Sequence, residues 1–159
     1  MKKALAITSL ALGIILAAPV YAADQPTNEQ AQAALDKIKA DKKYIVSQNM
    51  TLTDAESKAF WPVYEEYQDG LYKINQRMVG MIQEYADLYR NNTMTDDKAD
   101  KLIEQLLAIE TDELALKKTL VPKLEKALPG QKAARYMQIE NKLRALVKFE
   151  LADKIPLVK

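Results

Sequence analysis

The chain has 159 residues, with 23 Lys and Arg, 22 Asp and Glu, and neither histidine nor cysteine. This composition excludes disulfides and any Ser-His or Cys-His catalytic pair, and it removes the commonest protein ligands for metals. The balanced charge gives no concentrated basic surface, so we expect no nucleic-acid partner. Only three glycines follow residue 22, namely Gly70, Gly80 and Gly130, which excludes a glycine-rich phosphate loop.

Residues 1–22 have the pattern of a cleaved secretory signal peptide. Lys2 and Lys3 form a positive n-region, residues 4–18 form an apolar run, and the Val-Tyr-Ala sequence ending at Ala22 offers a cleavage site. A membrane anchor is the alternative, but the run has about 15 residues and a spanning helix needs about 20. No cysteine is present for a lipid anchor. We therefore expect cleavage after Ala22, a periplasmic location, and no stable membrane insertion after cleavage.

Cleavage would leave residues 23–159, which fit one domain of ordinary size. The first predicted helix runs from about residue 28 to 48, opened by a capping box between Thr27 and Gln30. Its apolar positions are sparse, and its polar face is basic. That face carries Lys37, Lys39, Lys42 and Lys43. We expect this helix to lie on the surface of the others.

Thr53 and Glu56 make a second capping box, which predicts a long helix ending near Arg90. Along it, apolar residues alternate steps of four and three, the pattern of a heptad seam that packs along a partner helix. The seam is Phe60, Tyr64, Tyr67, Leu71, Ile74, Met78, Met81, Tyr85 and Leu88. We interpret its aromatic residues and methionines as core rather than as a binding surface.

Thr95 caps a third helix, which ends at the sequence Leu128-Pro129-Gly130. Glu113 interrupts its apolar stripe, and we expect this carboxylate to pair with a basic residue of a facing helix. The stripe consists of Leu102, Leu106, Ile109, Leu116, Leu120 and Leu124.

Pro62 and Pro122 should lie at nearly the same height in a hairpin of the second and third helices, so both helices should bend there.

A fourth helix is predicted from residue 131 to about 152. Its apolar face is Tyr136, Ile139, Leu143, Leu146 and Val147. No strand pattern or internal repeat occurs anywhere in the sequence. The predicted fold class is all-α, with four helices: a long bent antiparallel hairpin with shorter N- and C-terminal helices, packed as an open bundle or as half of a dimer.

Two short segments carry a family resemblance. The second helix opens with Leu52-Thr53-Asp54-Ala55-Glu56 and the third with Met94-Thr95-Asp96-Asp97-Lys98. Both resemble the paired LTxxQ motifs of the Spy/CpxP family of periplasmic proteins. Both depart from the motif at its last position, and the second also at its first. Residues 128–140 are similar to the segment that joins the last two helices in exported relatives, and the resemblance covers residues 28–152.

The resemblance implies an ATP-independent chaperone or stress-sensing protein that forms an antiparallel, cradle-shaped dimer and holds unfolded polypeptides. Some relatives bind the sensor of an envelope-stress kinase instead. Others bind zinc through histidine-rich or cysteine-containing termini, which this chain lacks. We therefore expect no metal site and no cofactor.

Several aromatic and basic side chains are candidates for a polypeptide-binding or dimer surface. Helices of about 20 residues cannot cover a hairpin of about 35 residues at 1.5 Å per residue, so apolar residues of the hairpin should stay uncovered in a monomer. This predicted patch is Trp61, Tyr72, Val79, Tyr89 and Val121. Basic candidates are Lys39, Lys42 and Lys43, for which a solvated helix face is the simpler interpretation.

These features favour a binding protein over an enzyme. The leading hypothesis is a holdase-like chaperone for unfolded or envelope proteins. The alternative is a specific regulatory ligand of an envelope stress sensor without general chaperone activity. Catalysis by paired carboxylates is disfavoured, because helix neighbours such as Glu65 and Glu66 point about 100° apart. We also expect a two-fold homodimer that pairs through the hairpin.

Overall fold

The chain forms four helices in the computed structural model, which describes residues 28–158, with the side chains of residues 28–35 and 38 left out. They are α1 (Asn28–Asn49), α2 (Asp54–Arg90), α3 (Asp96–Ala127) and α4 (Gly130–Lys154). No strand occurs in this part of the chain, which confirms the all-α class. The predicted signal peptide and the Thr27 cap lie outside the described residues. None of the described helices is both long and apolar enough to cross a membrane.

The helices begin and end where local chemistry predicts. The Thr53 hydroxyl accepts a hydrogen bond from the Glu56 amide at 3.3 Å, and the Glu56 carboxylate accepts one from the Thr53 amide at 2.7 Å. Thr95 caps α3 by accepting a hydrogen bond from the Lys98 amide at 3.4 Å. Asn92, in the turn between α2 and α3, has a φ of 52°, a conformation that asparagine adopts more readily than most residues.

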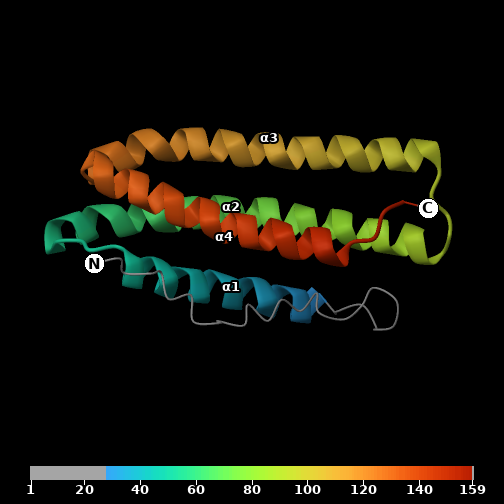
Figure 1. The fold of residues 1–159 in the computed structure, drawn as a ribbon, viewed down its shortest axis with the longest axis horizontal. Coiled ribbons are helices and arrows are strands. Elements are labelled where there is room, and N and C mark those ends of the chain that lie inside the picture. The colour runs from blue at the N-terminus through green and yellow to red at the C-terminus, as the bar shows by residue number, and fades with distance from the viewer. Residues whose placement is uncertain (1–27, 159) are drawn as a thin grey trace.

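Helices α2 and α3 run side by side in opposite directions, with α4 across α2 and α1 on the far side from α3 in the view of Figure 1. Side chains connect α2 and α3 along most of their length: Lys123 with Glu66, Arg77 with Asp112, and Gln105 with Glu84. Glu66 lies one turn after Pro62, and Lys123 directly follows Pro122, so the pair between them places the two prolines about five residues, or roughly 7 Å, apart along the helices. The two prolines are thus offset by more than one turn rather than level, and each helix continues through its proline.

The hydrophobic core lies where the end of α1, the start of α2, the end of α3 and the start of α4 meet. Phe60, Tyr64 and Tyr136 are fully buried there, and the Phe60 and Tyr136 ring centroids lie 5.0 Å apart in an edge-on arrangement. The heptad seam of α2 is buried from Phe60 to Ile74 and half-buried beyond. Phe60, Tyr64 and Tyr67 are thus core residues, as predicted from their spacing. Tyr85 is half-buried, and its hydroxyl donates to the Pro156 carbonyl at 2.7 Å.

Two leucines predicted to be buried are exposed, Leu106 on α3 and Leu146 on α4. Buried residues of α3 begin only at Ile109, and those of α4 end at Glu140. Both leucines continue a correct helical period but lie beyond the buried part of their helices.

Gly70 and Gly80 both lie inside α2 but have different surroundings. A Cβ at Gly70 would stand 2.8 Å from Cδ1 of Leu116, whereas at Gly80 no described atom other than the adjoining residues and the backbone of the same helix lies within 4 Å of a Cβ. Glycine inside a helix costs about 1 kcal/mol relative to alanine. Gly80→Ala should therefore raise the free energy of unfolding by about 0.5–1 kcal/mol. Gly70→Ala should raise it less, because Leu116 must move. Urea unfolding followed by circular dichroism tests both, and a larger gain at position 70 would contradict this packing.

Candidate functional site

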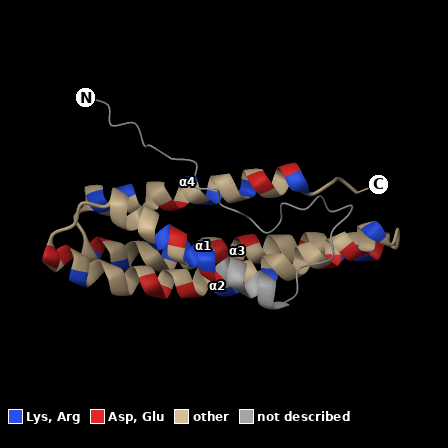
Figure 2. Ribbon diagram, turned by 90° about the horizontal axis from the view of Figure 1, so that it is seen from below, with Lys and Arg blue, Asp and Glu red and all other residues tan. Residues whose placement is uncertain are grey.

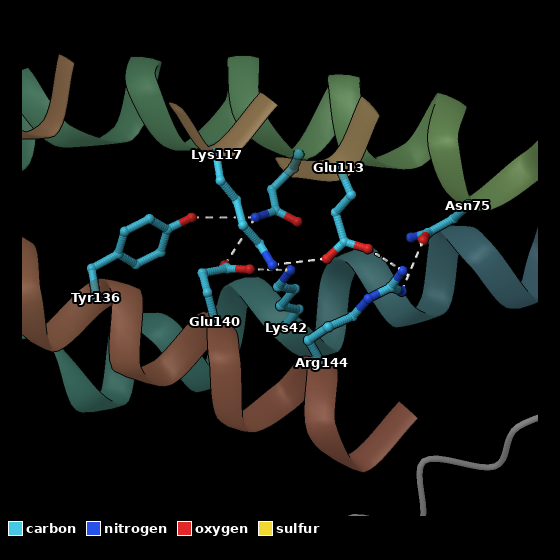
Figure 3. A network of polar contacts seen from close by, with 8 residues as sticks. Lys42, Asn75, Glu113, Lys117, Tyr136, Glu140 and Arg144 are labelled. Atoms are coloured by element: carbon cyan, nitrogen blue, oxygen red, sulfur yellow. Dashed lines mark hydrogen bonds and ion pairs between the residues drawn. The ribbon is translucent and has the colours of Figure 1, made fainter. Parts of the chain in front are cut away.

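A cluster of eight polar side chains lies next to the core and joins all four helices (Figure 3). We call it the polar network. It consists of Lys42 of α1, Gln68 and Asn75 of α2, Glu113 and Lys117 of α3, and Tyr136, Glu140 and Arg144 of α4. It contains two carboxylates and three cations. Its two carboxylates are the centres around which the other residues are arranged.

Glu140 connects α4 to α1 and α2. Its side chain is only 3% exposed, and Lys42 Nζ lies 2.6 Å from its Oε2. Gln68 Nε2 donates to its Oε1 at 3.1 Å and also lies 3.3 Å from the Tyr136 hydroxyl. Burial lowers the pKa of Lys42, and the Glu140 carboxylate opposes that shift. Glu140 is therefore a buried charge whose partners come from two other helices.

Glu113 connects α3 to α4. Arg144 donates to one of its carboxylate oxygens, and Lys117 Nζ lies 2.9 Å from the other. Arg144 also donates to the Asn75 side-chain oxygen at 3.3 Å. The predicted pairing of Glu113 with a basic residue of a facing helix is confirmed. Burial pushes the pKa of Glu113 upward, but the hydrogen bonds from Lys117 and Arg144 and the Arg144 charge outweigh it and lower the pKa.

The polar network joins the four helices to one another. Both carboxylates already accept hydrogen bonds from cations or from Gln68. Among the described residues, no group of three or more His, Cys, Asp or Glu side chains is placed to hold a metal ion. The two neighbouring acids Glu65 and Glu66 point to different helices, since Glu65 pairs with Lys43 of α1 and Glu66 with Lys123 of α3.

The lysines of α1 attach that helix to the bundle. Lys39 pairs with Asp69 at 2.6 Å and Lys43 with Glu65, and the Lys43 ammonium lies 5.5 Å from the centroid of the Trp61 ring. The expectation that Lys42 belongs to an open basic surface is wrong. Its side chain is only 13% exposed, because the buried Glu140 carboxylate requires a counter-charge. Lys39 and Lys43 remain partly or largely exposed but are paired.

The predicted aromatic patch is largely covered. Trp61 is half-buried: its indole N–H donates to the Ser57 hydroxyl at 3.0 Å, and its ring packs edge-on against Phe60 and Tyr64. Residues Tyr72, Val79 and Tyr89 are half-buried as well, and Val121 is exposed. The expectation of an uncovered patch therefore holds only for Val121. For Trp61 the reason is that its ring packs against Tyr64, one turn further along α2, and that the Lys43 ammonium of α1 lies near the ring.

An exposed apolar stripe on α3 is the surface that sequence reasoning missed. Ile103, Leu107, Leu114 and Val121 are 38–57% exposed and are spaced by four, seven and seven residues. At about 100° per residue, they fall within about 40° of one another around the helix. We call these four residues the α3 stripe. Their heptad spacing was readable from the sequence, but only one apolar face was assigned to each helix.

A second exposed apolar group lies near the end of α4. Phe149 is 69% exposed, and Leu146 is exposed on the same helix. Leu157 and Val158, which follow α4, are exposed too. Charged residues of both signs are distributed over the helices (Figure 2).

No protein-family model, curated protein or solved structure matches this chain. Fold and site together define an all-α protein in which a buried polar network joins four helices and apolar side chains stay exposed on α3 and α4.

Replacing Glu113 should destabilise the protein most at neutral pH. Glu113→Gln leaves Arg144 without its buried counter-charge, which should cost about 3 kcal/mol of unfolding free energy. Because the pKa of Glu113 lies below its ordinary value of 4.5 in the folded state, the stability due to ionised Glu113 is present above that value. It is lost as the pH falls through the folded-state pKa. Urea unfolding at pH 7, 5, 4 and 3 should show the gap between wild type and variant closing. The exposed Glu125→Gln control should shift stability by less than about 0.5 kcal/mol, and a pH-independent gap for Glu113→Gln would refute the assignment.

Two of the three buried tyrosines of the core, Tyr64 and Tyr136, should respond oppositely to loss of their hydroxyls. The Tyr64 hydroxyl is buried without a hydrogen-bond partner among the described residues, and such a group costs about 1–3 kcal/mol. Tyr64→Phe should therefore raise the free energy of unfolding by about 1 kcal/mol. Tyr136→Phe removes a contact of Gln68 and should lower it by about 1 kcal/mol. Equilibrium unfolding of the two variants tests this, and an equal loss in both would be inconsistent with it.

Proposed function

We propose that this protein is exported, cleaved after Ala22, and acts in the periplasm as an ATP-independent, holdase-like binding protein for unfolded or envelope polypeptides. The proposal assigns it no catalytic step and no cofactor. The observation that carries it is the α3 stripe, an apolar surface that the protein leaves in solvent while burying a separate core.

The α3 stripe has the dimensions of a polypeptide-binding surface. From Ile103 to Val121 it extends over 18 residues, or about 27 Å at 1.5 Å per residue. Single exposed apolar residues are ordinary, but aligned ones usually mark a site of interaction. The stripe lies on a helix that the core and the polar network both hold, so it is presented as a fixed surface.

Two further features support the proposal. Residues 1–22 have a signal-peptide pattern, which supports export. The segments that resemble the Spy/CpxP motifs supply the caps of α2 and α3, so the resemblance coincides with the architecture. The family assignment, the long bent hairpin and an open, cradle-like dimer remain part of the proposal.

Aggregation suppression tests the proposed function. Residues 23–159 should reduce light scattering by an unfolded, aggregating protein without ATP at equimolar or higher ratios. Leu107→Ser/Leu114→Ser should lose at least half of this effect, because it removes the middle of the α3 stripe. Tyr44→Ser is the matched control, since Tyr44 is 61% exposed on α1, and it should retain the effect.

Lack of suppression by the wild-type chain would refute the holdase. Retention of one dominant partner from periplasmic extract, lost in the double variant, would support the alternative of a specific regulatory ligand. Equal suppression by the wild type and the double variant would show that the α3 stripe is not the binding surface.

A further inference from the structure

The charged residues that border the α3 stripe are mostly acidic. At about 100° per residue, seven charged side chains of α3 lie within about 60° of a stripe residue around the helix. Five of them are acids and two are bases: Asp96, Asp100, Glu104, Glu110, Lys117, Lys118 and Glu125. Asp112 and Lys123, at other angles, pair with residues of α2. The stripe is therefore an apolar surface with an acidic border.

Most of this acidic charge is not balanced within the chain. Glu110 pairs with Lys148 of α4 at 3.0 Å, and Lys117 pairs with Glu113. The other five border residues are exposed and have no ion-pair partner among residues 28–158. They are Asp96, Asp100, Glu104, Lys118 and Glu125. Four acids against one base leave a net charge of −3 beside the stripe.

Three of these acids repel one another. Asp96, Asp100 and Glu104 follow at steps of four residues, about 6 Å along the helix axis, and like charges at this spacing destabilise a helix. The two lysines of the same segment do not relieve the repulsion. Lys98 donates to the Thr93 carbonyl at 2.8 Å, and Lys101 lies about 120° around the helix from Leu107. A cation supplied from outside the described fold would relieve it.

We propose that the α3 stripe selects polypeptide segments in which basic residues stand beside apolar ones. This inference rests on the proposed function and names the class of segment bound. Apolar side chains of the segment cover the stripe, and its lysines or arginines pair with the acidic border, above all with Asp100 and Glu104. Complementary charge of this kind contributes more to specificity than to affinity. Acidic segments of equal apolar content are therefore rejected.

Peptides of matched apolar content test the selection. Three unstructured peptides share the same leucines, serines and glycines and the same neutral dye, and carry lysine, glutamine or glutamate at the remaining positions. By fluorescence anisotropy, residues 23–159 should bind the lysine peptide at least about ten-fold more tightly than the glutamine peptide, and the glutamate peptide most weakly. Added salt should reduce these differences by screening.

Two variants test whether the acidic border is the source of the selection. Asp100→Asn/Glu104→Gln should weaken binding of the lysine peptide several-fold and leave binding of the glutamine peptide unchanged, because the apolar side chains are kept. Asp100→Lys/Glu104→Lys changes the border charge from −3 to +1 and should abolish or reverse the preference. The control Glu150→Gln/Asp153→Asn, which alters two exposed acids of α4, should keep the wild-type preference. Circular dichroism should show unchanged helicity in all three variants.

The peptide results separate this inference from the proposed function. Aggregation suppression by a wild-type chain that shows no preference among the peptides, or that binds none of them, would overturn the selection and leave the holdase intact. A preference for the lysine peptide that persists in both border variants would overturn it as well. Absence of both peptide binding and aggregation suppression would refute the proposed function and the selection together.

A lipid surface is the other apolar partner that the experiment distinguishes. Because the acidic border repels anionic headgroups, vesicles of an anionic phospholipid should not bind residues 23–159. Vesicle binding that is lost in Leu107→Ser/Leu114→Ser would assign the α3 stripe to a lipid surface and overturn the selection of basic segments.

Discussion

The architecture depends on two buried carboxylates that no single helix can satisfy. Glu140 needs Lys42 of α1 and Gln68 of α2, and Glu113 needs Arg144 of α4. Removing one partner of a buried ion pair costs about 3–5 kcal/mol, because the remaining charge is left uncompensated. The polar network therefore favours one arrangement of the helices. In it, α1, α3 and α4 pack around α2, and each is held at one position along the α2 axis.

The position of the polar network also explains why apolar surface remains outside. The core fills the end of the molecule where the four helices meet, and the network follows it toward the middle. Beyond that point α4 has exposed Leu146 and Phe149, and α3 has Ile103 and Leu107. Because the core and the polar network stabilise the bundle, these apolar side chains can remain exposed to solvent. The proposal for polypeptide binding starts from this division.

Contacts within the chain give several residues a role that differs from the one predicted from the sequence. Lys42, which belongs to the basic face predicted for the first helix, is instead internal and pairs with the buried Glu140. The ring of Trp61, which lies off the heptad seam, packs against Tyr64 of the same helix. The apolar side chains that remain exposed include the α3 stripe and a smaller group near the end of α4.

The sequence alone determined the helices, their caps, the heptad seam and the need of Glu113 for a cation, because these depend on neighbours within a few residues along one helix. It also showed the spacing of the α3 stripe, without showing which of two apolar faces would be buried. Only the tertiary structure decided that Lys42 lies inside, that Leu106 and Leu146 lie beyond the core, and that Trp61 is covered. These outcomes depend on where a neighbouring helix ends and on which charged side chains it places nearby. The periodicity of a single helix gives information on neither.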